Sequence, residues 1–392
     1  MSKRRLTYDD YKVGWVCALP IELAAAEQLL EERHSDLPPV GADDNLYALG
    51  CIAGHNVVIA SLPEGQMGNV SAATAAVQMN STFKLCRFTL LVGIGGGVSS
   101  QDHDVRLGDV VVEKPVSDHG GVIQYDMGKV TPSGNIRTGS LNSPPRVLLN
   151  ALAKIQANTI LGKDTTATTL SKLGADIPIF SRTKAGHDVL YRASYNHVGG
   201  RTCQGCDTSE VVQRSDRPRT NGSHMVVHYG AIASGNRVIK DAATRDSISK
   251  ELGGVLCFEM EAAGLATSIS CLVIRGISDY ADSHKNDTWQ PHAAAAAAAF
   301  AKEILSVIPP AVATEAESAT MRAQAHIVKW LSPLNFFITH HDVLSRHVSG
   351  TGKELLESSK FLSWLATPGG GLWCQGSRES SSQQTAKADG QW

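Results

Sequence analysis

Residues 258–264 read FEMEAAG and residues 273–282 read VIRGISDYAD, and these two stretches are the clearest indication of the fold. The second stretch begins within a mainly apolar run, Leu272–Ile277, which predicts a central strand covered on both faces. Asp279 comes after that run, at the expected end of the strand. Because ligand sites in open α/β sheets form at the carboxyl ends of strands, Asp279 is a candidate site residue.

Two carboxylates precede this strand, Glu259 and Glu261, and we expect them to open a helix. They could take part in chemistry, or they could only favour a helix N-terminus through its dipole. Their spacing alone leaves both interpretations open.

Strand-like apolar runs alternate with helical patterns through the first 310 residues. The predicted strands are Lys12–Leu19, Asn56–Leu62, Thr89–Gly93, Asp109–Glu113, Val227–Ser234 and Cys271–Ile277. The predicted helices are Ile21–Arg33, Val70–Phe83, Pro145–Ile155, Asp241–Leu252, Glu259–Ser270 and Pro291–Val307. This alternation indicates an α/β fold with a parallel or mixed sheet and helices on both sides. A less regular insertion is expected over Leu161–Ser223.

The composition excludes several classes of protein. The 392 residues are 42% hydrophobic, and Lys+Arg 36 against Asp+Glu 38 gives a formal charge of -2, which favours neither nucleic acid nor a membrane surface as partner. We find neither a secretory signal nor a membrane-spanning run. Most of the eight cysteines stand alone in apolar runs, which predicts a reduced, cytoplasmic protein.

A glycine cluster, GIGGG at 93–97, follows the predicted strand Thr89–Gly93, and GDVVV follows at 108–112. Consecutive glycines after a strand let a ligand approach backbone N–H groups, although such glycines are usually only a turn. The cluster is neither a dinucleotide fingerprint nor a Walker loop.

Six pieces of this sequence, in order, resemble the purine nucleoside phosphorylase / uridine phosphorylase superfamily, particularly its nucleosidase branch. The pieces are KVGWVCALPIE, VGIGGG, GDVVV, IASGNRVI, FEMEAAG and VIRGISDYAD. The resemblance covers residues 10–308 and is closest to fungal proteins that fuse this domain to a NACHT-type module. It implies a three-layer nucleoside-phosphorylase-like fold, with a mixed central sheet, helices on both faces and a short helical C-terminal tail.

The resemblance also implies the reaction, which is cleavage of the N-glycosidic bond of a purine nucleoside or nucleotide. Asp279 matches the acid that protonates or hydrogen-bonds purine N7, which requires burial to raise its pKa. Glu261 and Met260 match the pair that holds the ribose. The cleavage passes through an oxocarbenium-like state, which a nearby carboxylate stabilises.

The resemblance assigns further substrate contacts. Val238 and Ile239 match residues that line the base, and Gly95 and Gly96 match a glycine turn beside the attacking water or phosphate. Ser278 is expected to contact substrate as well. No cofactor and no catalytic metal is expected.

Glu22 bears on the choice between water and phosphate. It matches the glutamate that activates water in nucleosidases, or it is an ordinary first-turn carboxylate after Pro20. The Gly-Asp-Pro-x-Arg segment by which hexameric phosphorylases hold phosphate is absent from the sequence, so we favour hydrolysis. The alternatives are a phosphate-dependent phosphorylase and, in another class, a non-catalytic purine-sensing or interaction module of a fungal NLR-like receptor. Relatives assemble as oligomers, so a homo-oligomer is expected.

Four basic residues beside the matched pieces could contact a 5′-phosphate, or they could be solvated surface charge. They are Arg237, Lys240, His284 and Lys285. Nucleotides up to ATP are therefore conceivable substrates.

The pair Cys203 and Cys206 could form a zinc knuckle in the insertion with His197, His224 or His228. A second C-x₂-C pair is absent from the sequence and the histidine spacing fits no standard pattern, so free thiols are the favoured interpretation.

The sequence beyond the matched region is expected to lie outside the α/β fold. Residues 309–325 read as a small-residue linker, and residues 326–376 as a helical segment resembling the lead-in to a NACHT-type domain. GTGK at 350–353 lacks the Walker spacing. Residues 377–392 are expected to be disordered.

Overall fold

The computed structural model describes residues 3–116, 119–132, 134–200, 202–217, 224–310 and residue 361. The chain divides into two compact units, Met1–Ala313 and Thr314–Trp392, and all described strands and helices belong to the first. The predicted linker from residue 311 onward, the helical segment and the disordered tail lie outside the described residues, apart from residue 361.

The elements alternate along the chain as the sequence predicts. The strands are β1 (Val13–Cys17), β2 (Glu32–Arg33), β3 (Tyr47–Ile52), β4 (His55–Ser61), β5 (Phe88–Gly97), β6 (Val110–Glu113), β7 (Val122–Gln124), β8 (Gly128–Thr131), β9 (Gly134–Arg137), β10 (Val227–Gly230), β11 (Ile232–Ser234), β12 (Cys257–Glu259) and β13 (Cys271–Asp279). The α-helices are α1 (Pro20–Gln28), α2 (Asn69–Thr82), α3 (Arg146–Ile160), α4 (Thr166–Asp176), α5 (Ala242–Glu251), α6 (Ala262–Ser268) and α7 (Gln290–Val307).

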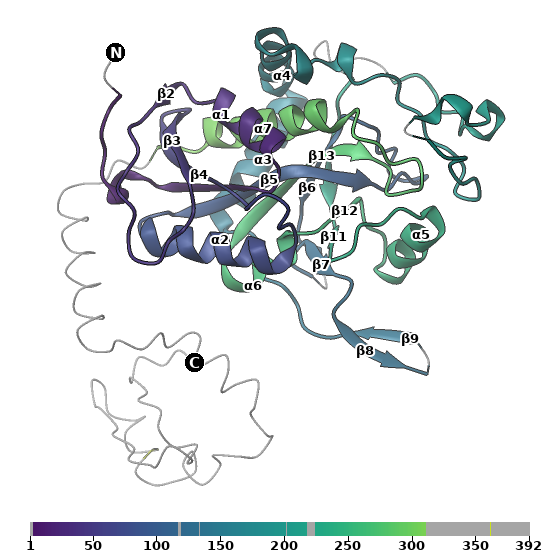
Figure 1. The fold of residues 1–392 in the computed structure, drawn as a ribbon, viewed down its shortest axis with the longest axis horizontal. Helices are drawn as coiled ribbons and strands as arrows, with labels where there is room; N and C mark the ends of the chain where they lie inside the picture. Colours follow the sequence, from purple (N-terminus) through teal and green to yellow (C-terminus); the bar gives the residue numbers. More distant parts are fainter. Residues whose placement is uncertain are drawn as a thin grey trace. The chain divides into compact units, whose positions relative to one another are not determined.

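The central sheet is mixed, which confirms the predicted class. Its main path runs β10-β6-β13-β5-β1-β4-β3-β2, and β7, β11 and β12 extend it beside β5. The four central strands β13, β5, β1 and β4 pair in parallel, whereas β6 pairs antiparallel with β13. Strand β5 also pairs antiparallel with β12 at its carboxyl end, so one long strand joins the two parts of the sheet (Figure 1).

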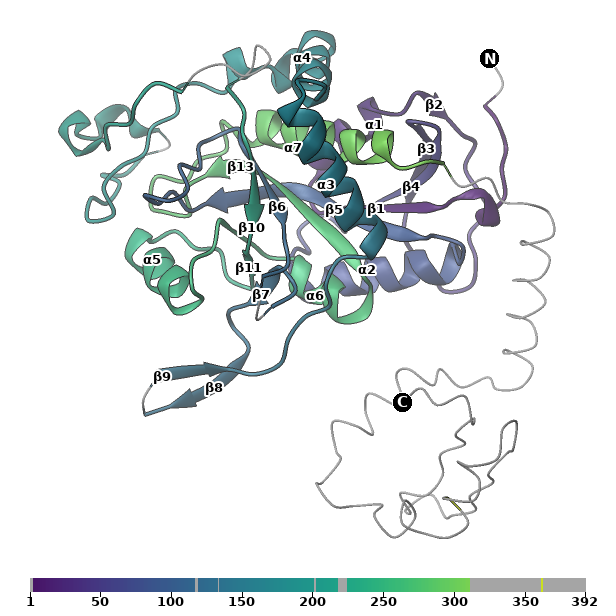
Figure 2. The same ribbon diagram turned by 180° about the vertical axis from the view of Figure 1, so that it is seen from behind.

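Helices cover both faces of the sheet and complete the three layers. In both views α2 and α6 lie on one side of the central strands, and α1, α3, α4 and α7 lie on the other (Figures 1 and 2). Each face has its own core of buried apolar side chains, one centred on Trp15, Leu90 and Phe300 and the other on Val16, Leu91 and Met79. Trp15 and Val16 are neighbours that point to opposite faces, as strand geometry requires.

Several element boundaries differ from the predicted ones, because residues at these positions pair with strands that are distant in sequence. The predicted helix Ile21–Arg33 ends at Gln28, because Glu32–Arg33 pairs with β3 as strand β2. The predicted helix Glu259–Ser270 begins only at Ala262, because Glu259 ends strand β12. The predicted strand Val227–Ser234 splits into β10 and β11, which pair with different neighbours.

The predicted insertion is more regular than its composition suggests. It contains helix α4, whose apolar face contributes Leu170 and Leu173 to the core beside α7, followed by several short 3-10 turns.

The alanine run of α7 lets this helix lie unusually close to the sheet. Ala293–Ala299 are each at most 2% exposed, which supports the predicted packing helix. Opposite this run, a Cβ added at Gly276 of β13 would lie 1.9 Å from the backbone oxygen of Ala293. Small residues on both elements are therefore a steric requirement of the contact.

We expect Gly276→Ala to destabilise the fold by about 1–3 kcal/mol or more, because α7 must move away from β13 to admit the new methyl group. Urea unfolding followed by circular dichroism measures the loss. Ser270→Ala, an exposed change just before the same strand, is the control and should keep the wild-type midpoint. Equal midpoints for both variants would contradict the close contact.

Candidate functional site

A pocket of about 280 Å³ opens at the carboxyl ends of β5 and β13, beside the start of α1. This size is near the lower end of the range for small-molecule sites, about 300–1000 Å³. The side chains and backbone around it are Ala18, Leu19, Glu22, Met67, Ile94, Gly95, Gly96, Arg237, Val238, Ile239, Phe258, Glu259, Met260, Glu261, Ser278, Asp279, Ala281, Lys285 and Gln290. All nine site residues expected from the sequence therefore line one cavity, although their chemical roles stay predictions.

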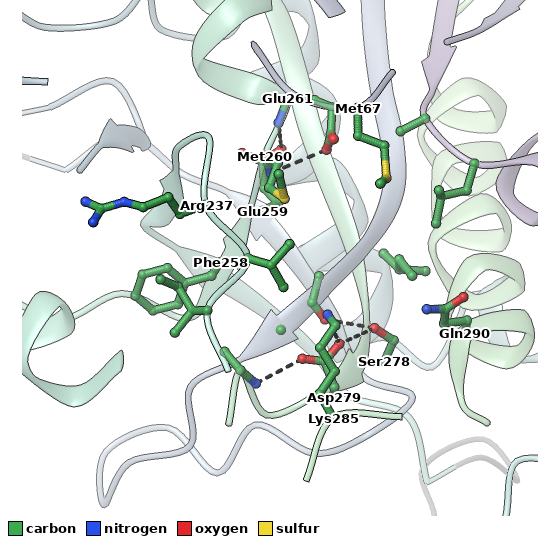
Figure 3. Close-up of a pocket in the computed structure, with 18 of the residues that line it drawn as sticks. Met67, Arg237, Phe258, Glu259, Met260, Glu261, Ser278, Asp279, Lys285 and Gln290 are labelled. Carbon is green, nitrogen blue, oxygen red and sulfur yellow. Dashed lines mark hydrogen bonds and ion pairs between the residues drawn. The ribbon is translucent and has the colours of Figure 1, made fainter. Parts of the chain in front are cut away.

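The polar groups of the pocket gather at two ends. Figure 3 shows Glu259 and Glu261 together at one end, and Asp279 with Ser278 and Lys285 at the other. The aromatic ring of Phe258 lies to the side between them in this view. A ligand that spans the pocket would contact carboxylates at both ends.

Arg275 lies beneath the first end and holds its carboxylates together. It is the fifth residue of β13 and is 1% exposed. Its Nη2 contacts the carboxylate of Glu259 and lies 3.3 Å from Oε2 of Glu261. A buried guanidinium is tolerated only with such partners, since an unpaired charge in the interior is very costly.

Glu22 is the third buried carboxylate of this cluster. Its Oε2 accepts hydrogen bonds from the backbone N–H groups of Ala18 (2.7 Å) and Leu19 (2.9 Å), and its Oε1 accepts one from Ile94 of β5 (2.8 Å). Glu22 therefore does cap the first turn of α1, but it also links that turn to β5 at the edge of the pocket. The structural and the chemical interpretations of Glu22 are compatible.

Three carboxylates around one guanidinium cannot all remain charged without cost. Burial raises the pKa of Glu261 to about 7, against the opposing Arg275 guanidinium and with help from Glu259 and Glu22. Burial likewise raises the pKa of Glu22, although Arg275 and the backbone N–H donors oppose it. Burial lowers the pKa of Arg275, but its three carboxylate neighbours outweigh burial and raise it overall. The cluster thus holds one carboxyl group, that of Glu261, which can gain or lose a proton near neutral pH.

Asp279 forms the second polar end and is itself 5% exposed. Its Oδ2 accepts hydrogen bonds from Ser278 Oγ (2.8 Å) and Lys285 Nζ (2.8 Å), and its Oδ1 accepts one from the backbone N–H of Ala281 (3.0 Å). The pairing of β13 with β5 shifts register between Ile277 and Asp279, and such irregularities re-aim side chains at strand ends. Asp279 ends the strand instead of following it.

The glycines at 93–97 are required for a different physical reason from the one expected from the sequence. Gly95 and Gly96 lie within β5 and do not form a turn after it. A Cβ at Gly93 would lie 2.4 Å from Nη1 of Arg275, and one at Gly96 would lie 2.9 Å from Oδ1 of Asp279. The glycines therefore make room for the charged side chains of the neighbouring strand, and no positive φ angle is involved at these positions.

Sequence reasoning assigned no role to Arg275, although it lies inside a quoted motif. The sequence does indicate a role for it, because Arg275 is a charged residue in a central apolar strand. Such a residue requires a buried partner of opposite charge. Glu259 was interpreted as a helix residue, whereas it ends β12 and pairs with Arg275. Met67 and Gln290 were also missed, because they reach the pocket from loops and helices distant in sequence.

The basic residues near the motifs divide into two groups. Arg237 and Lys285 line the pocket, whereas Lys240 and His284 do not. Val238 is 49% exposed, so the predicted base-lining segment forms an outer wall of the cavity.

Comparisons with known proteins agree with this architecture. The family model described as Phosphorylase superfamily matches residues 12–308. A nucleotide-binding leucine-rich repeat (NLR)-like protein from Hyaloscypha variabilis is 46% identical over 306 residues, covering 78% of this chain and 30% of its own length. ATP nucleosidase Cap17 from Escherichia coli is 25% identical over 301 residues, covering 74% of this chain and 50% of its own length. The chain therefore spans at most about half the length of either of these relatives.

A solved structure has the same fold at low sequence identity. It is a 5'-methylthioadenosine/S-adenosylhomocysteine nucleosidase from Neisseria meningitidis in complex with methylthio-immucillin-A, with a TM-score of 0.50 and 18% identity, covering 76% of this chain and 99% of that one. Within the described residues no helix has the length and apolar character needed to cross a membrane. The expected homo-oligomer and cytoplasmic location stay predictions.

Arg275→Met should cost about 3–5 kcal/mol of stability at neutral pH, because it leaves three buried carboxylates without their cation. The loss should shrink at about pH 5, because burial raises the pKa of Glu261 to about 7 and this carboxylate takes up a proton as pH falls. Urea unfolding at both pH values measures it, with Arg87→Met, an exposed arginine next to β5, as control. A loss that is small, or that is the same at both pH values, would argue against the cluster as described.

The raised pKa of Glu261 predicts a pH dependence of folding. Between its ordinary value of 4.5 and about 7 the folded chain binds more protons than the unfolded chain, so stability falls as pH rises through this window. Glu261→Gln removes this contribution and should flatten the decline by on the order of 1–3 kcal/mol. Unfolding free energies from about pH 5 to about pH 8 test it. The exposed Glu64→Gln variant should keep the wild-type slope, and an unchanged slope in Glu261→Gln would refute the assignment.

Proposed function

The chain belongs to the phosphorylase superfamily, and on that premise we propose that it hydrolyses the N-glycosidic bond of a purine nucleoside or nucleotide. The observation that carries the proposal is the gathering of Glu22, Glu261 and Asp279 around one nucleoside-sized pocket. The name of the Escherichia coli relative, a nucleosidase, supports the same class of reaction. The products would be the free base and ribose or a ribose phosphate.

Each end of the pocket suits one part of such a substrate. Apolar contacts from Phe258 and Ile239 and the acid Asp279 suit a purine base, because the ring needs a flat apolar surface and N7 needs a hydrogen-bond donor. The carboxylates Glu259 and Glu261 suit the ribose hydroxyls as acceptors. This assignment places negative charge next to the sugar, where an oxocarbenium-like transition state develops positive charge.

Asp279 would deliver or share the proton that lets the base leave in neutral form. In the structure its Oδ2 is already bonded to Lys285 and Ser278, each at 2.8 Å. The two contacts hold the Asp279 carboxylate at the end of the pocket where N7 of a bound purine would have to lie. Proton transfer by such a positioned group contributes about 10²–10⁴-fold to the rate.

Water is a better nucleophile for this pocket than phosphate. Glu22, Glu259 and Glu261 would repel a phosphate dianion, and Arg275 is buried and already engaged by Glu259 and Glu261. Glu22 has a raised pKa caused by burial, which suits a base that accepts a proton from water near neutral pH. These charges favour hydrolysis over phosphorolysis.

The number of phosphates on the substrate depends on the cations that line the pocket. Lys285 pairs with Asp279 at the end proposed for the base, which leaves Arg237 as the cation for a 5′-phosphate, and one relative is an ATP nucleosidase. Both nucleosides and nucleotides therefore belong in the substrate test.

A second candidate function rests on the 46% identical relative. That protein is NLR-like, and the match covers 30% of its length, so this domain could serve as a purine-sensing or interaction module of a receptor. Purine binding without turnover would favour this alternative.

Chromatographic detection of free base tests the proposal directly. Adenosine, inosine, guanosine, AMP and ATP are each incubated with the full chain, with and without inorganic phosphate. We expect base release without phosphate, and a fall of about 10²–10⁴-fold in Asp279→Asn. Asp102→Asn, an exposed aspartate outside the pocket, should retain wild-type activity.

The outcomes separate the candidates. Release only in the presence of phosphate would make the chain a phosphorylase and remove the role of Glu22 as water-activating base. Undetectable release from every substrate, combined with purine binding by calorimetry, would replace hydrolysis with the sensing function.

A further inference from the structure

A second cluster of chemically reactive side chains lies in the insertion, outside the pocket. Ligand atoms of His197, Cys203 and Cys206 all lie within 4.8 Å of one another. None of the three lines the pocket. Cys206 is 7% exposed, so one thiol of the pair is buried beside the other two groups.

The local backbone brings the two cysteines to the same side. Cys203–Gly205 forms a 3-10 turn, and the N–H of Cys206 donates to the carbonyl oxygen of Cys203 at 3.1 Å. This tight turn between the two thiols is the geometry by which C-x₂-C pairs bind a single metal ion.

The hydrogen bonds of His197 give it the protonation that a metal ligand needs. Its Nδ1 accepts from the N–H of Gly199 at 3.1 Å, and its Nε2 lies 3.1 Å from the carbonyl oxygen of Thr202. This pattern places the proton on Nε2 and leaves the lone pair on Nδ1, which would exchange its hydrogen bond from the Gly199 N–H for the ion. A backbone carbonyl that accepts from the distal N–H is the usual second contact of a metal-bound histidine.

His284 lies next to this group but outside the 4.8 Å range that its three members share, so its side chain would have to shift to complete a tetrahedron. Both of its ring nitrogens are buried without a hydrogen-bond partner, and its side chain is 6% exposed. Its ring lies 5.5 Å from that of His197 and stacks on Tyr191 at 4.1 Å. The carboxylate of Asp282 lies 3.8 Å from its Nδ1, which leaves Nε2 for a ligand. A buried imidazole without partners is costly, so it requires an explanation such as an ion.

We propose that His197, Cys203 and Cys206 bind a structural zinc ion, with His284 as the fourth ligand. Two thiolates and imidazole nitrogens select zinc over calcium or magnesium, which prefer oxygen. Four protein ligands would close the coordination sphere, as in structural sites. Of the histidines considered from the sequence, only His197 shares with the two cysteines the 4.8 Å range, which His224 and His228 do not.

The ion would tie the insertion to one wall of the pocket. The N–H of His197 donates to Oγ of Ser283 at 3.0 Å, and His284 is followed by Lys285, which contacts Asp279 at 2.8 Å. Zinc at this node would therefore fix the segment that carries Lys285. This inference does not depend on the reaction catalysed.

Metal analysis of the full chain tests the proposal. The chain is purified without an affinity histidine tag or chelator, and zinc is measured by mass spectrometry. We expect about one zinc ion per chain, and little in Cys203→Ser or Cys206→Ser. Cys51→Ser, a partly exposed thiol on β3, is the matched control and should keep its zinc.

Cobalt substitution tests the ligands without relying on variants that could fail to fold. Cobalt(II) added to the metal-free wild-type chain should give the absorption bands of tetrahedral thiolate coordination. His284→Ala should weaken metal binding by about 10-fold or more. Undiminished binding in that variant would overturn His284 as the fourth ligand.

Two results would overturn the metal site as a whole. One is a wild-type chain without zinc whose thiols react with a disulfide reagent at the same rate with and without chelator. The other is a Cys203–Cys206 disulfide found by peptide mass spectrometry in the freshly purified chain.

Discussion

One buried guanidinium organises the pocket of this protein. Arg275 lies in the middle of β13 and faces carboxylates from three separate places, Glu22 on α1, Glu259 at the end of β12 and Glu261 at the start of α6. In a low-dielectric interior an unpaired charge is very costly, so each of these elements is held where its carboxylate can reach Arg275. The same pairing leaves an excess of negative charge at one end of the pocket.

The packing around β5 follows from this requirement. Gly93 leaves the space that Nη1 of Arg275 and the carboxylate of Glu22 occupy, and Gly96 leaves the space beside Asp279. On the same strand as Arg275, Gly276 allows the alanine face of α7 to approach. Glycines thus leave the volume that the charged side chains and the approaching helix fill, because a close-packed interior has no spare space beside them.

The segment from Asp282 to Lys285 connects two chemically different regions. At one end Lys285 contacts Asp279 in the pocket. Ser283 and His284, two residues and one residue earlier, contact the insertion through His197 and Tyr191. A change in the insertion can therefore alter the position of a cation in the pocket through a few residues of backbone. The insertion is thereby part of the site's support, although its composition resembles that of a surface loop.

The class of fold and the candidate site residues are predictable from local sequence. Apolar strands in alternation with helices require a sheet covered on both faces, and the ordered motifs contain Glu22, Glu261 and Asp279. Which residues face one another depends on tertiary contacts. Glu259 ends a strand and pairs with Arg275, Glu32–Arg33 joins a sheet edge, and His197 instead of His224 or His228 lies beside the cysteine pair. Local patterns specify which face of an element is buried, but a buried charge or ligand finds its partner only when segments distant in sequence close on one another.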